Sequence, residues 1–473
     1  MVFSSLSFLF LFLPITLLFY IIMPNIKAKN GLLVVVSLLF YAWGEPVYVL
    51  LLLASVLVNY IIALLIEKYE KQAKLYVTIS VVLNLSMLAV FKYAGFLTES
   101  VNGVFGISLP VPQISLPIGI SFFTFQILSY VLDVYRKDTP AQKSFGKILL
   151  YISFFPQLIA GPIVKYHDIN LQLSDREMSL SKMADGFVRF IVGLSKKVII
   201  SNVAALVADY VFALPQGNIT TLGAWSGAVC YMLQIYFDFS GYSDMAIGLG
   251  KIFGFEFKEN FNYPYIAFGI KDFWRRWHIS LSTWFKEYLY IPLGGNRKGK
   301  ARTYINQFIV FAATGIWHGA NVTFLLWGLI HGILLTLESA KIIPPDKAKK
   351  HLITRIIFHI YTLLAILLSF VLFRADTVRD AGVVIARMFG IGAQAYSNAG
   401  ILTYFTPYFI FMLCVGVIGS TPIVPFIKKK IIDIGVKENV VNAVSFVICV
   451  LLFVFCTLLL TSDTYNPFIY FRF

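Results

Sequence analysis

Two histidines in an apolar stretch are the first candidates for chemistry. The chain reads ATGIWHGANVTFLLWGLIHG over residues 313–332, so His318 and His331 lie among side chains that suit the interior of a membrane. A buried imidazole tends to lose its proton because desolvation disfavours the cation, and the neutral ring can accept a proton from a hydroxyl near pH 7. Ionisable residues inside membranes are more often functional than not. The pattern therefore favours a general base at His318 and leaves His331 open to a functional or a packing role.

The geometry of this stretch decides whether the two rings can work together. In one unbroken helix they would lie about 20 Å apart and about 220° around the axis, so they could not meet. Gly319, Ala320 and Asn321 can break the helix, and the second half would then turn back. The two rings can then share a cavity and need not touch, and Trp317 and Asn321 are weaker candidates for the same pocket.

A third histidine, His278, lies in the region 251–302, which is too polar to span a membrane. On the spacing of the apolar residues around it, His278 is either an incidental residue of a membrane anchor or a ring that faces a cavity at the cytoplasmic mouth. The basic loop GGNRKGK that follows could contact a phosphate-bearing donor, although basic cytoplasmic loops are common in membrane proteins. Large apolar side chains recur here at steps of three and four, which predicts an amphipathic helix in the membrane interface: Trp274, Trp277, Leu281, Trp284 and Tyr288.

Two acidic residues lie near the end of another apolar segment, in the stretch FDFSGYSDMAIGLG. Asp238 and Asp244 would sit at the inner end of a span over residues 222–238. Three roles stay open for them: a partner for a catalytic side chain, a cap for a helix end, or a solvated charge at the membrane surface.

The composition excludes an ordinary soluble protein. Of the 473 residues, 58% are hydrophobic and 13% are charged, and the mean hydropathy is +0.78, whereas a soluble domain is usually about 25% charged. Long apolar runs recur throughout, which predicts an all-α polytopic membrane protein. The net charge of +15 then reflects basic cytoplasmic loops rather than a nucleic-acid surface. The four cysteines lie in apolar runs without a Cys-x-x-Cys pair, so we expect no metal or redox centre.

The distribution of lysine and arginine among the linkers predicts the orientation of the chain in the membrane. The basic stretches 165–197 and 251–302 are assigned to the cytoplasm, and the N-terminus then lies outside. The segment 374–400 also lies outside in this scheme, despite its arginines, as does the aromatic tail 462–473. The predicted apolar segments are 6–23, 31–43 with 47–66, 75–95, 117–135, 145–164, 199–214, 222–238, 303–318, 322–338, 355–373, 403–425 and 440–461.

One of these segments does not fit a simple alternation between the two sides. Residues 145–164 have basic sequence on both sides and contain Pro156, Gly161 and Pro162. Proline and glycine interrupt helices, and irregular backbone at membrane depth is tolerated only where protein or water surrounds it. The pattern favours a broken or re-entrant helix.

Several long motifs, in order along the chain, resemble the membrane-bound O-acyltransferase (MBOAT) superfamily, and above all its alginate O-acetyltransferase branch. The resemblance covers nearly the whole chain. It implies one integral-membrane domain over residues 1–473, with about eleven transmembrane helices and further re-entrant and interfacial helices around a central tunnel, in a bacterial plasma membrane. The motifs are LPIGISFFTFQILSYVLDVYR, FFPQLIAGPIVKYHDI, YFDFSGYSDMAIGLGKIFGFEFKENFNYPY, FWRRWHISLSTWFKEYLYIPLGGNRKG and IWHGANVTFLLWGLIHG.

The resemblance also implies roles for particular residues. His318, in the WHG motif, matches the catalytic histidine of the family, and His278, in the RRWH motif, matches a second histidine of the same tunnel. His331 matches no catalytic residue and stays a pocket candidate. The ending TYNPFIYFRF is similar to an aromatic motif of relatives that export acyl groups, in which a tyrosine is proposed to carry the acyl group; here that residue is Tyr470. An aromatic anchor at the membrane interface is the other interpretation of this tail.

The implied reaction takes an acyl group, most often acetyl, from a cytoplasmic thioester such as acetyl-CoA or an acyl carrier protein. A separate extracytoplasmic transferase, similar to SGNH hydrolases, would pass the group on to a polysaccharide. A thioester has a good leaving group, so one neutral histidine can serve as the base, and neither a metal nor a tightly bound cofactor is required. Two alternatives stay open: D-alanyl transfer to teichoic acid, and a transporter or flippase that exports a glycan without making bonds.

Overall fold

The computed structural model describes residues 1–345, 351–392, 397–462 and 468–469, and within these ranges the chain is helical with no β-strand. The all-α fold class is therefore confirmed, and the apolar helices make the chain a multi-pass membrane protein. In this part of the chain seven helical segments are long and apolar enough to span a membrane, or eight if one bent pair is counted, and the predicted total of about eleven stays a prediction. The seven are Ile26–Gly44, Tyr48–Lys68, Glu70–Phe105, Leu180–Ala213, Val322–Ser339, Leu352–Arg374 and Glu438–Ser462.

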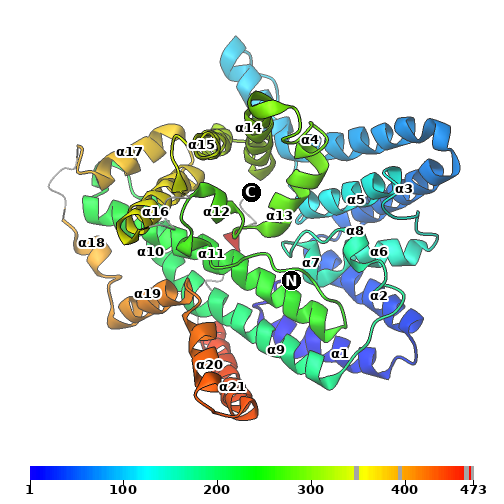
Figure 1. Cartoon of the computed structure of the whole chain (residues 1–473). Helices are drawn as coiled ribbons and strands as arrows, with labels where there is room; N and C mark the ends of the chain where they lie inside the picture. The colour runs from blue at the N-terminus through cyan, green and yellow to red at the C-terminus, as the bar shows by residue number, and fades with distance from the viewer. Residues whose placement is uncertain (346–350, 393–396, 463–467, 470–473) are drawn as a thin grey trace. The chain divides into compact units, whose positions relative to one another are not determined.

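The helices, which are labelled in Figure 1, belong to two compact units. The first unit comprises Met1–Phe190 and Ser243–Lys258, and the second comprises Ile191–Tyr242 and Glu259–Phe473. All three candidate histidines belong to the second unit, so the fold of that unit decides how they are placed.

Aromatic side chains fill the interior of the first unit. The Phe3 ring centroid lies 5.0 Å from that of Phe8 and 5.7 Å from that of Phe40, and Phe40 lies 5.5 Å from Phe155. Such contacts suit a chain whose outer surface is already apolar, because packing rather than exclusion from water must hold the helices together. The helices are α1 (Leu13–Ile22), α2 (Ile26–Gly44), α3 (Tyr48–Lys68), α4 (Ala73–Phe105), α5 (Ile120–Tyr135), α6 (Phe145–Ser153), α7 (Phe155–Leu158), α8 (Tyr166–Ile169) and the larger part of α9 (Leu180–Ser195).

A small polar network joins α3 to α4 inside the first unit. Ser80 Oγ donates a hydrogen bond to Asn59 Oδ1 at 2.6 Å, and Asn84 Nδ2 donates to the same oxygen at 2.8 Å. All three side chains are buried. Between two apolar helices, hydrogen bonds of this kind select the partner and its register.

The predicted break between α5 and α8 is confirmed. Helix α6 ends at Ser153, Phe154 leaves the helical conformation with a ψ of 113°, and α7 begins with Pro156 in its first turn. Proline suits that position because the first helical amides have no intrahelical acceptor. Gly161 follows where a Cβ would lie 2.5 Å from the Cα of Gln157. The re-entrant position of this segment in a membrane stays a prediction.

The second unit has a core of small and aliphatic side chains on three helices. Ala224 and Ala228 of α11 pack against Leu367 and Val371 of α16, and Val384 of α17 joins them. The unit contains η3 (Lys196–Ser201), α10 (Asn202–Ala213), most of α11 (Thr221–Ile252), α12 (Ile270–Trp274), α13 (Ile279–Phe285), η6 (Lys286–Tyr290), α14 (Gly299–His318), α15 (Val322–Ser339), α16 (Leu352–Arg374), α17 (Val378–Met388), α18 (Ala399–Leu402), α19 (Pro407–Gly419), α20 (Ile423–Asp433) and α21 (Glu438–Ser462).

One predicted boundary is wrong, and another predicted segment is bent. The stretch 165–197 is not an extended cytoplasmic linker, because α9 runs into the π-helical turn η3 and then α10, and Leu180–Ala213 forms one candidate span. The segment 403–425 is not one straight helix, because α19 and α20 meet at an angle of 68°; that it forms one span stays a prediction. Helix α20 then packs beside α21, drawn in orange-red to red in Figure 1.

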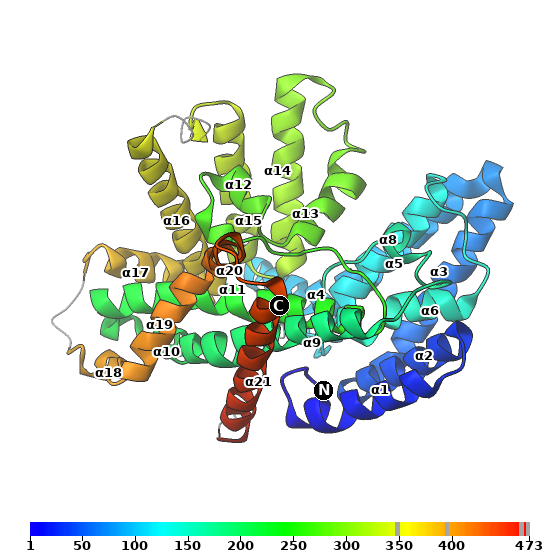
Figure 2. The same cartoon turned by 60° about the horizontal axis from the view of Figure 1, so that its bottom comes forward.

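Helices α14 and α15 form a closely packed antiparallel hairpin (Figure 2). Two glycines face the partner backbone: a Cβ on Gly315 would overlap Phe324 O, and one on Gly328 would overlap Phe311 O. Helix α14 ends at His318, Gly319 is extended with a φ of −178°, and α15 begins at Val322. The predicted helix break is therefore confirmed, and it turns the second half back along the first.

Candidate functional site

A cluster of buried rings brings the three candidate histidines together. The Trp317 ring centroid lies 6.2 Å from that of His278 and 4.8 Å from that of His318. The Trp327 ring centroid lies 5.1 Å from that of His318 and 4.9 Å from that of His331. His318 and His331 are therefore neighbours of one ring despite their sequence separation. We refer to these residues as the histidine–tryptophan cluster, which comprises Trp274, His278, Trp317, His318, Trp327 and His331.

The turn after α14 places His318 in this cluster. His318 is the last residue of α14, and its ring also lies 5.0 Å from that of Phe373, nearly edge to face. Asn321 caps α15, because its Oδ1 accepts a hydrogen bond from Thr323 N at 3.0 Å. Its Nδ2 donates to Asp376 O at 2.8 Å. Both ends of the Asn321 amide are thus used to hold the turn, and this favours a structural role over a pocket role for Asn321.

Both ring nitrogens of His331 are occupied by neighbouring residues. Trp274 Nε1 can only donate, and it lies 3.2 Å from His331 Nδ1, so that nitrogen accepts. The proton of the neutral ring then sits on Nε2, which lies 3.1 Å from Ser369 Oγ. The Ser369 hydroxyl in turn donates a hydrogen bond to the backbone oxygen of Ile366 at 2.8 Å. The chain of bonds leaves no nitrogen for a substrate and favours a packing role for His331.

His278 is buried and is held in an unusual backbone conformation. It lies just before α13 with φ 43° and ψ 55°, the left-handed region, which costs a residue with a Cβ roughly 1–2 kcal/mol. Its Nδ1 lies 3.2 Å from Asn260 Oδ1. Its Nε2 is buried and has no hydrogen-bond partner among the residues that the structure describes. Burial lowers the pKa of the ring to about 3, so His278 is neutral.

The interfacial helix predicted around His278 is wrong in two respects. The region contains two short helices, α12 and α13, separated by the left-handed turn at His278. The apolar side chains of the pattern are all buried in the protein rather than presented to lipid: Trp274, Trp277, Leu281, Trp284 and Tyr288. The spacing thus reflects packing within the second unit, and His278 is not an incidental residue of a membrane anchor.

Asp238 binds two partners in the interior of the second unit. Its Oδ1 pairs with Lys197 Nζ at 2.7 Å, and the two side chains are only 1% and 4% exposed. Its Oδ2 accepts a hydrogen bond from the backbone N–H of Ile469 at 2.7 Å. The adjacent Phe468 ring lies 4.8 Å from that of Tyr242. Asp238 is therefore neither a helix-end cap nor a solvated charge: it lies within α11 and binds residues of the aromatic tail.

Two further candidates cannot be assigned to the cluster. Asp244 belongs to the first unit, where Arg189 contacts its Oδ1 through Nη2 at 2.6 Å and through Nε at 2.9 Å. Asp244 also lies inside α11 rather than at its end, so a helix-capping role is wrong for it as well. Tyr470 lies outside the described residues, and its role as an acyl relay stays a prediction.

A basic cavity of about 670 Å³ opens beside α12 in the second unit. Two acidic residues also line it. Asp272 pairs with Arg276 at 3.1 Å, and Glu338 accepts hydrogen bonds from the backbone N–H groups of Ile270 and Lys271. The surplus of cations suits a ligand that carries phosphate groups. The basic residues that line the cavity are Lys271, Arg275, Arg276, Lys341 and Arg355.

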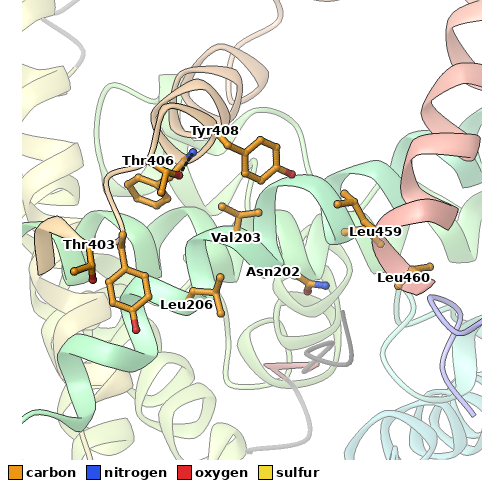
Figure 3. Close-up of a pocket in the computed structure, with 11 residues that line it drawn as sticks. Asn202, Val203, Leu206, Thr403, Thr406, Tyr408, Leu459 and Leu460 are labelled. Carbon is orange, nitrogen blue, oxygen red and sulfur yellow. Dashed lines mark hydrogen bonds between the residues drawn. The ribbon is translucent and has the colours of Figure 1, made fainter. Parts of the chain in front are cut away.

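A second cavity of the same unit, about 240 Å³, has a different character (Figure 3). Val203 and Leu206 of α10 face Tyr408 of α19 and Leu459 of α21 across it. Neither His278 nor His318 is among the described residues that line this cavity. The described residues also contain no group of three or more His, Cys, Asp or Glu side chains placed to hold one metal ion.

Sequence reasoning missed Asn260 and Lys197, which hold two of the candidates. Asn260 lies 18 residues before its partner His278, in a loop without periodicity, so no pattern linked them. Lys197 was assigned with its neighbours to a cytoplasmic linker. The partner of Arg374 was also missed: Arg374 pairs with Asp209 at 2.8 Å. A cation at the edge of an apolar segment was the one available signal for Lys197 and Arg374.

The chain is similar in sequence to one protein family and to several curated proteins. The model of the membrane-bound O-acyltransferase family matches residues 38–374, a range that contains the whole histidine–tryptophan cluster. A probable alginate O-acetylase of Pseudomonas putida is 40% identical, with 100% of each chain covered. A peptidoglycan O-acetyltransferase of Helicobacter pylori is 37% identical over 83% of this chain and 80% of that protein. A teichoic acid D-alanyltransferase of Bacillus subtilis is 30% identical over 46% of this chain and 58% of that protein.

Proposed function

This chain belongs to the membrane-bound O-acyltransferase family, and on that basis we propose that it moves an acetyl group from a cytoplasmic thioester across the membrane for O-acetylation of a cell-surface polysaccharide. It is an O-acyltransferase and an integral membrane protein. Acetyl is favoured because the relatives that match most of the chain are an alginate O-acetylase and a peptidoglycan O-acetyltransferase. The names of these two relatives differ in the polymer, so they do not identify the polymer that this chain acetylates.

The observation that carries the proposal is the placement of two buried histidines on the ring of Trp317. His318 takes the proton of the attacking hydroxyl while the hydroxyl oxygen bonds to the thioester carbonyl carbon. The tetrahedral intermediate then collapses, the carbon–sulfur bond breaks, and the thiolate takes the proton back from the His318 imidazolium. His278 offers its buried Nε2 as a second acceptor that orients the hydroxyl or the donor. No metal takes part in this scheme.

The basic cavity beside α12 supports the choice of donor. Coenzyme A carries several phosphates and a carrier protein carries one on its prosthetic arm, so either donor would be attracted to a cavity lined by lysine and arginine. The charge pattern of the chain assigns the 251–302 region, which supplies Lys271, Arg275 and Arg276 to the cavity, to the cytoplasm. The cavity is therefore proposed as the entry for the thioester.

The placement of the aromatic tail supports the proposal that the acyl group is exported across the membrane. Phe468 and Ile469 are buried, and Ile469 is bonded to Asp238 inside the second unit, so the chain next to Tyr470 is anchored to the protein. We assign Tyr470 as the acyl carrier on the extracytoplasmic side, from which a partner transferase, similar to SGNH hydrolases, takes the acetyl group to the polymer. Intact-mass analysis of the purified protein checks this: acetyl on the wild type and none on Tyr470→Phe is expected, and an unmodified wild type during turnover contradicts the covalent step.

D-alanyl transfer is the second candidate, because the Bacillus subtilis relative is 30% identical, although it covers only 46% of this chain. Feeding cells with isotope-labelled acetate or labelled D-alanine distinguishes acetyl transfer from D-alanyl transfer. Only one of the two labels should enter the polymer in cells that contain this protein and be absent from the polymer in cells that lack it. A glycan exporter that makes no bonds is disfavoured, because each relative described above is named for acyl transfer.

The deciding experiment replaces His318 by Ala in cells that otherwise lack the protein. O-acetyl content and total exported polymer are both measured. We expect acetylation to fall by about 10²–10⁴-fold, the usual contribution of a general base, with export unchanged. The matched control is His351→Ala, because His351 is exposed at the start of α16. Normal acetylation with lost export in the His318 variant would overturn the acyltransferase mechanism.

A further inference from the structure

Asn260 holds the proton of the His278 ring on one nitrogen. The Oδ1 atom of Asn260 lies 3.1 Å from the backbone N of Ser280 and 3.2 Å from His278 Nδ1. A backbone N–H can only donate, so the side-chain atom that it meets must be the amide oxygen of Asn260 and not its nitrogen. That oxygen can only accept, and His278 Nδ1 must therefore carry the ring proton.

The backbone of His278 depends on the same residue. Ile279 N donates to Asn260 O at 2.9 Å, and Asn262 N donates to Arg276 O at 2.9 Å. These bonds tie the loop at 260–262 to the turn before α13. A left-handed histidine persists only where its surroundings over-determine it, and such positions concentrate at functional sites. Asn260, fully buried, thus fixes both the backbone and the ring of His278.

We infer that Asn260 is a positioning residue that keeps His278 in the neutral form with Nδ1 protonated, so that Nε2 is the atom that accepts a proton or a hydrogen bond from the substrate. The inference rests on the proposed role of His278 in acyl transfer. Two observations point to Nε2 as the working atom: it is buried, and it has no hydrogen-bond partner among the described residues. The low pKa of the buried ring agrees with a neutral acceptor.

The first test reads the tautomer directly and does not depend on activity. The chain has six histidines, so selective ¹⁵N-histidine labelling of the purified full-length protein gives few signals, and His278→Gln identifies the one of interest. We expect the His278 signals of a neutral ring with a protonated Nδ1 and an unprotonated Nε2 in the wild type. A protonated Nε2 would overturn the inference even if His278 proves essential.

The second test changes Asn260 and follows the pH profile of acetyl transfer. In Asn260→Asp a carboxylate meets Nδ1–H and stabilises the imidazolium, so activity should fall at low pH where the wild type is still active. In Asn260→Ala the ring loses its fixed proton position, and we expect turnover to drop about 10- to 100-fold, the usual effect of losing an orienting partner. A purely structural role for Asn260 would lower the amount of folded protein without moving the pH profile.

Ser280→Ala is the matched control. Ser280 Oγ donates to the same Asn260 oxygen at 2.9 Å and lies 3.5 Å from His278 Nδ1, but the variant keeps the backbone N–H of Ser280 and the shorter contact between Asn260 Oδ1 and His278 Nδ1. It should therefore retain the wild-type tautomer and pH profile. An Asn260→Asp profile that overlays the wild type, or an equal shift in Ser280→Ala, would contradict the inference. Full activity of His278→Gln would contradict the proposed role of His278 instead, and the two failures are thus distinguishable.

Discussion

Replacement of Gly328 by Ala tests whether the backbone packing of α14 against α15 sets the position of His318. A Cβ at this position would overlap Phe311 O and would lie 3.1 Å from the Cα of Gly315. Both neighbours are backbone atoms, which cannot rotate away. Ordinary contact requires 3.4–4 Å, so the two helices would have to separate by about 1 Å in an interior that is already close-packed.

The expected loss of stability follows from two opposing effects. Overpacking of a filled interior usually costs about 1–3 kcal/mol. Alanine is the better helix former by roughly 0.5–1 kcal/mol, which offsets part of that cost. We therefore expect a net loss of about 0–2.5 kcal/mol, centred near 1 kcal/mol. Activity should fall as well at temperatures where the variant is still folded, because the His318 and Trp327 rings lie 5.1 Å apart across this helix pair.

Thermal unfolding of the purified protein in detergent, followed by acetyl transfer below the transition, measures both effects. Gly332→Ala is the matched control on the same helix, since its Cβ would meet only Phe311 Cβ at 3.3 Å and Phe308 beyond it. That variant should differ from the wild type by no more than about 0.5 kcal/mol. If Gly328→Ala matches Gly332→Ala in both stability and turnover, then close backbone packing does not position His318 and the reasoning fails.

Two more predictions concern the other histidines. His331→Leu leaves the buried Trp274 N–H without its acceptor, so it should lose about 1–3 kcal/mol of stability while the folded fraction keeps near-normal turnover; a large loss of turnover at unchanged stability would assign His331 to catalysis instead. The hydrogen bond to Asp133, at 2.8 Å, raises the pKa of His167. That stabilisation is fully present below the ordinary histidine pKa of about 6.5 and disappears as pH rises through the raised value. The melting-temperature advantage of wild type over His167→Gln should therefore be small, because the ring is partly exposed, and should shrink towards alkaline pH; an advantage that grows with pH would contradict it.

Local sequence signals predicted the features that depend on local chain chemistry. The break at Gly319–Asn321 follows from residues that cannot continue a helix, and the break before Pro156 has the same origin. The apolar runs marked most spans for the same reason, since a membrane-crossing helix is a local property of about twenty residues. Boundaries failed where a helix continued through polar residues, as α9 does by running into η3 at Lys196 and Lys197.

Long-range pairings were the part that the sequence could not supply. Asn260, which contacts His278, is 18 residues away from it in the chain, and Ile469, which donates to Asp238, is 231 residues away. Nothing in the local pattern connects either pair. The helical spacing of the apolar residues from Trp274 to Tyr288 has two interpretations. A stripe of aromatic residues on a helix suits a lipid interface and a protein interior equally well. Only the burial of these side chains separates the two interpretations.

The network between α3 and α4 has a consequence for how the chain is assembled in the membrane. Each helix is apolar enough to enter the bilayer alone, so Asn59, Ser80 and Asn84 are not needed for insertion. In lipid, however, an amide without a partner is costly, and each helix can relieve that cost by finding the complementary one. The trio therefore gives two helices that emerge in succession from the ribosome a chemical means of selecting each other before the rest of the protein is made.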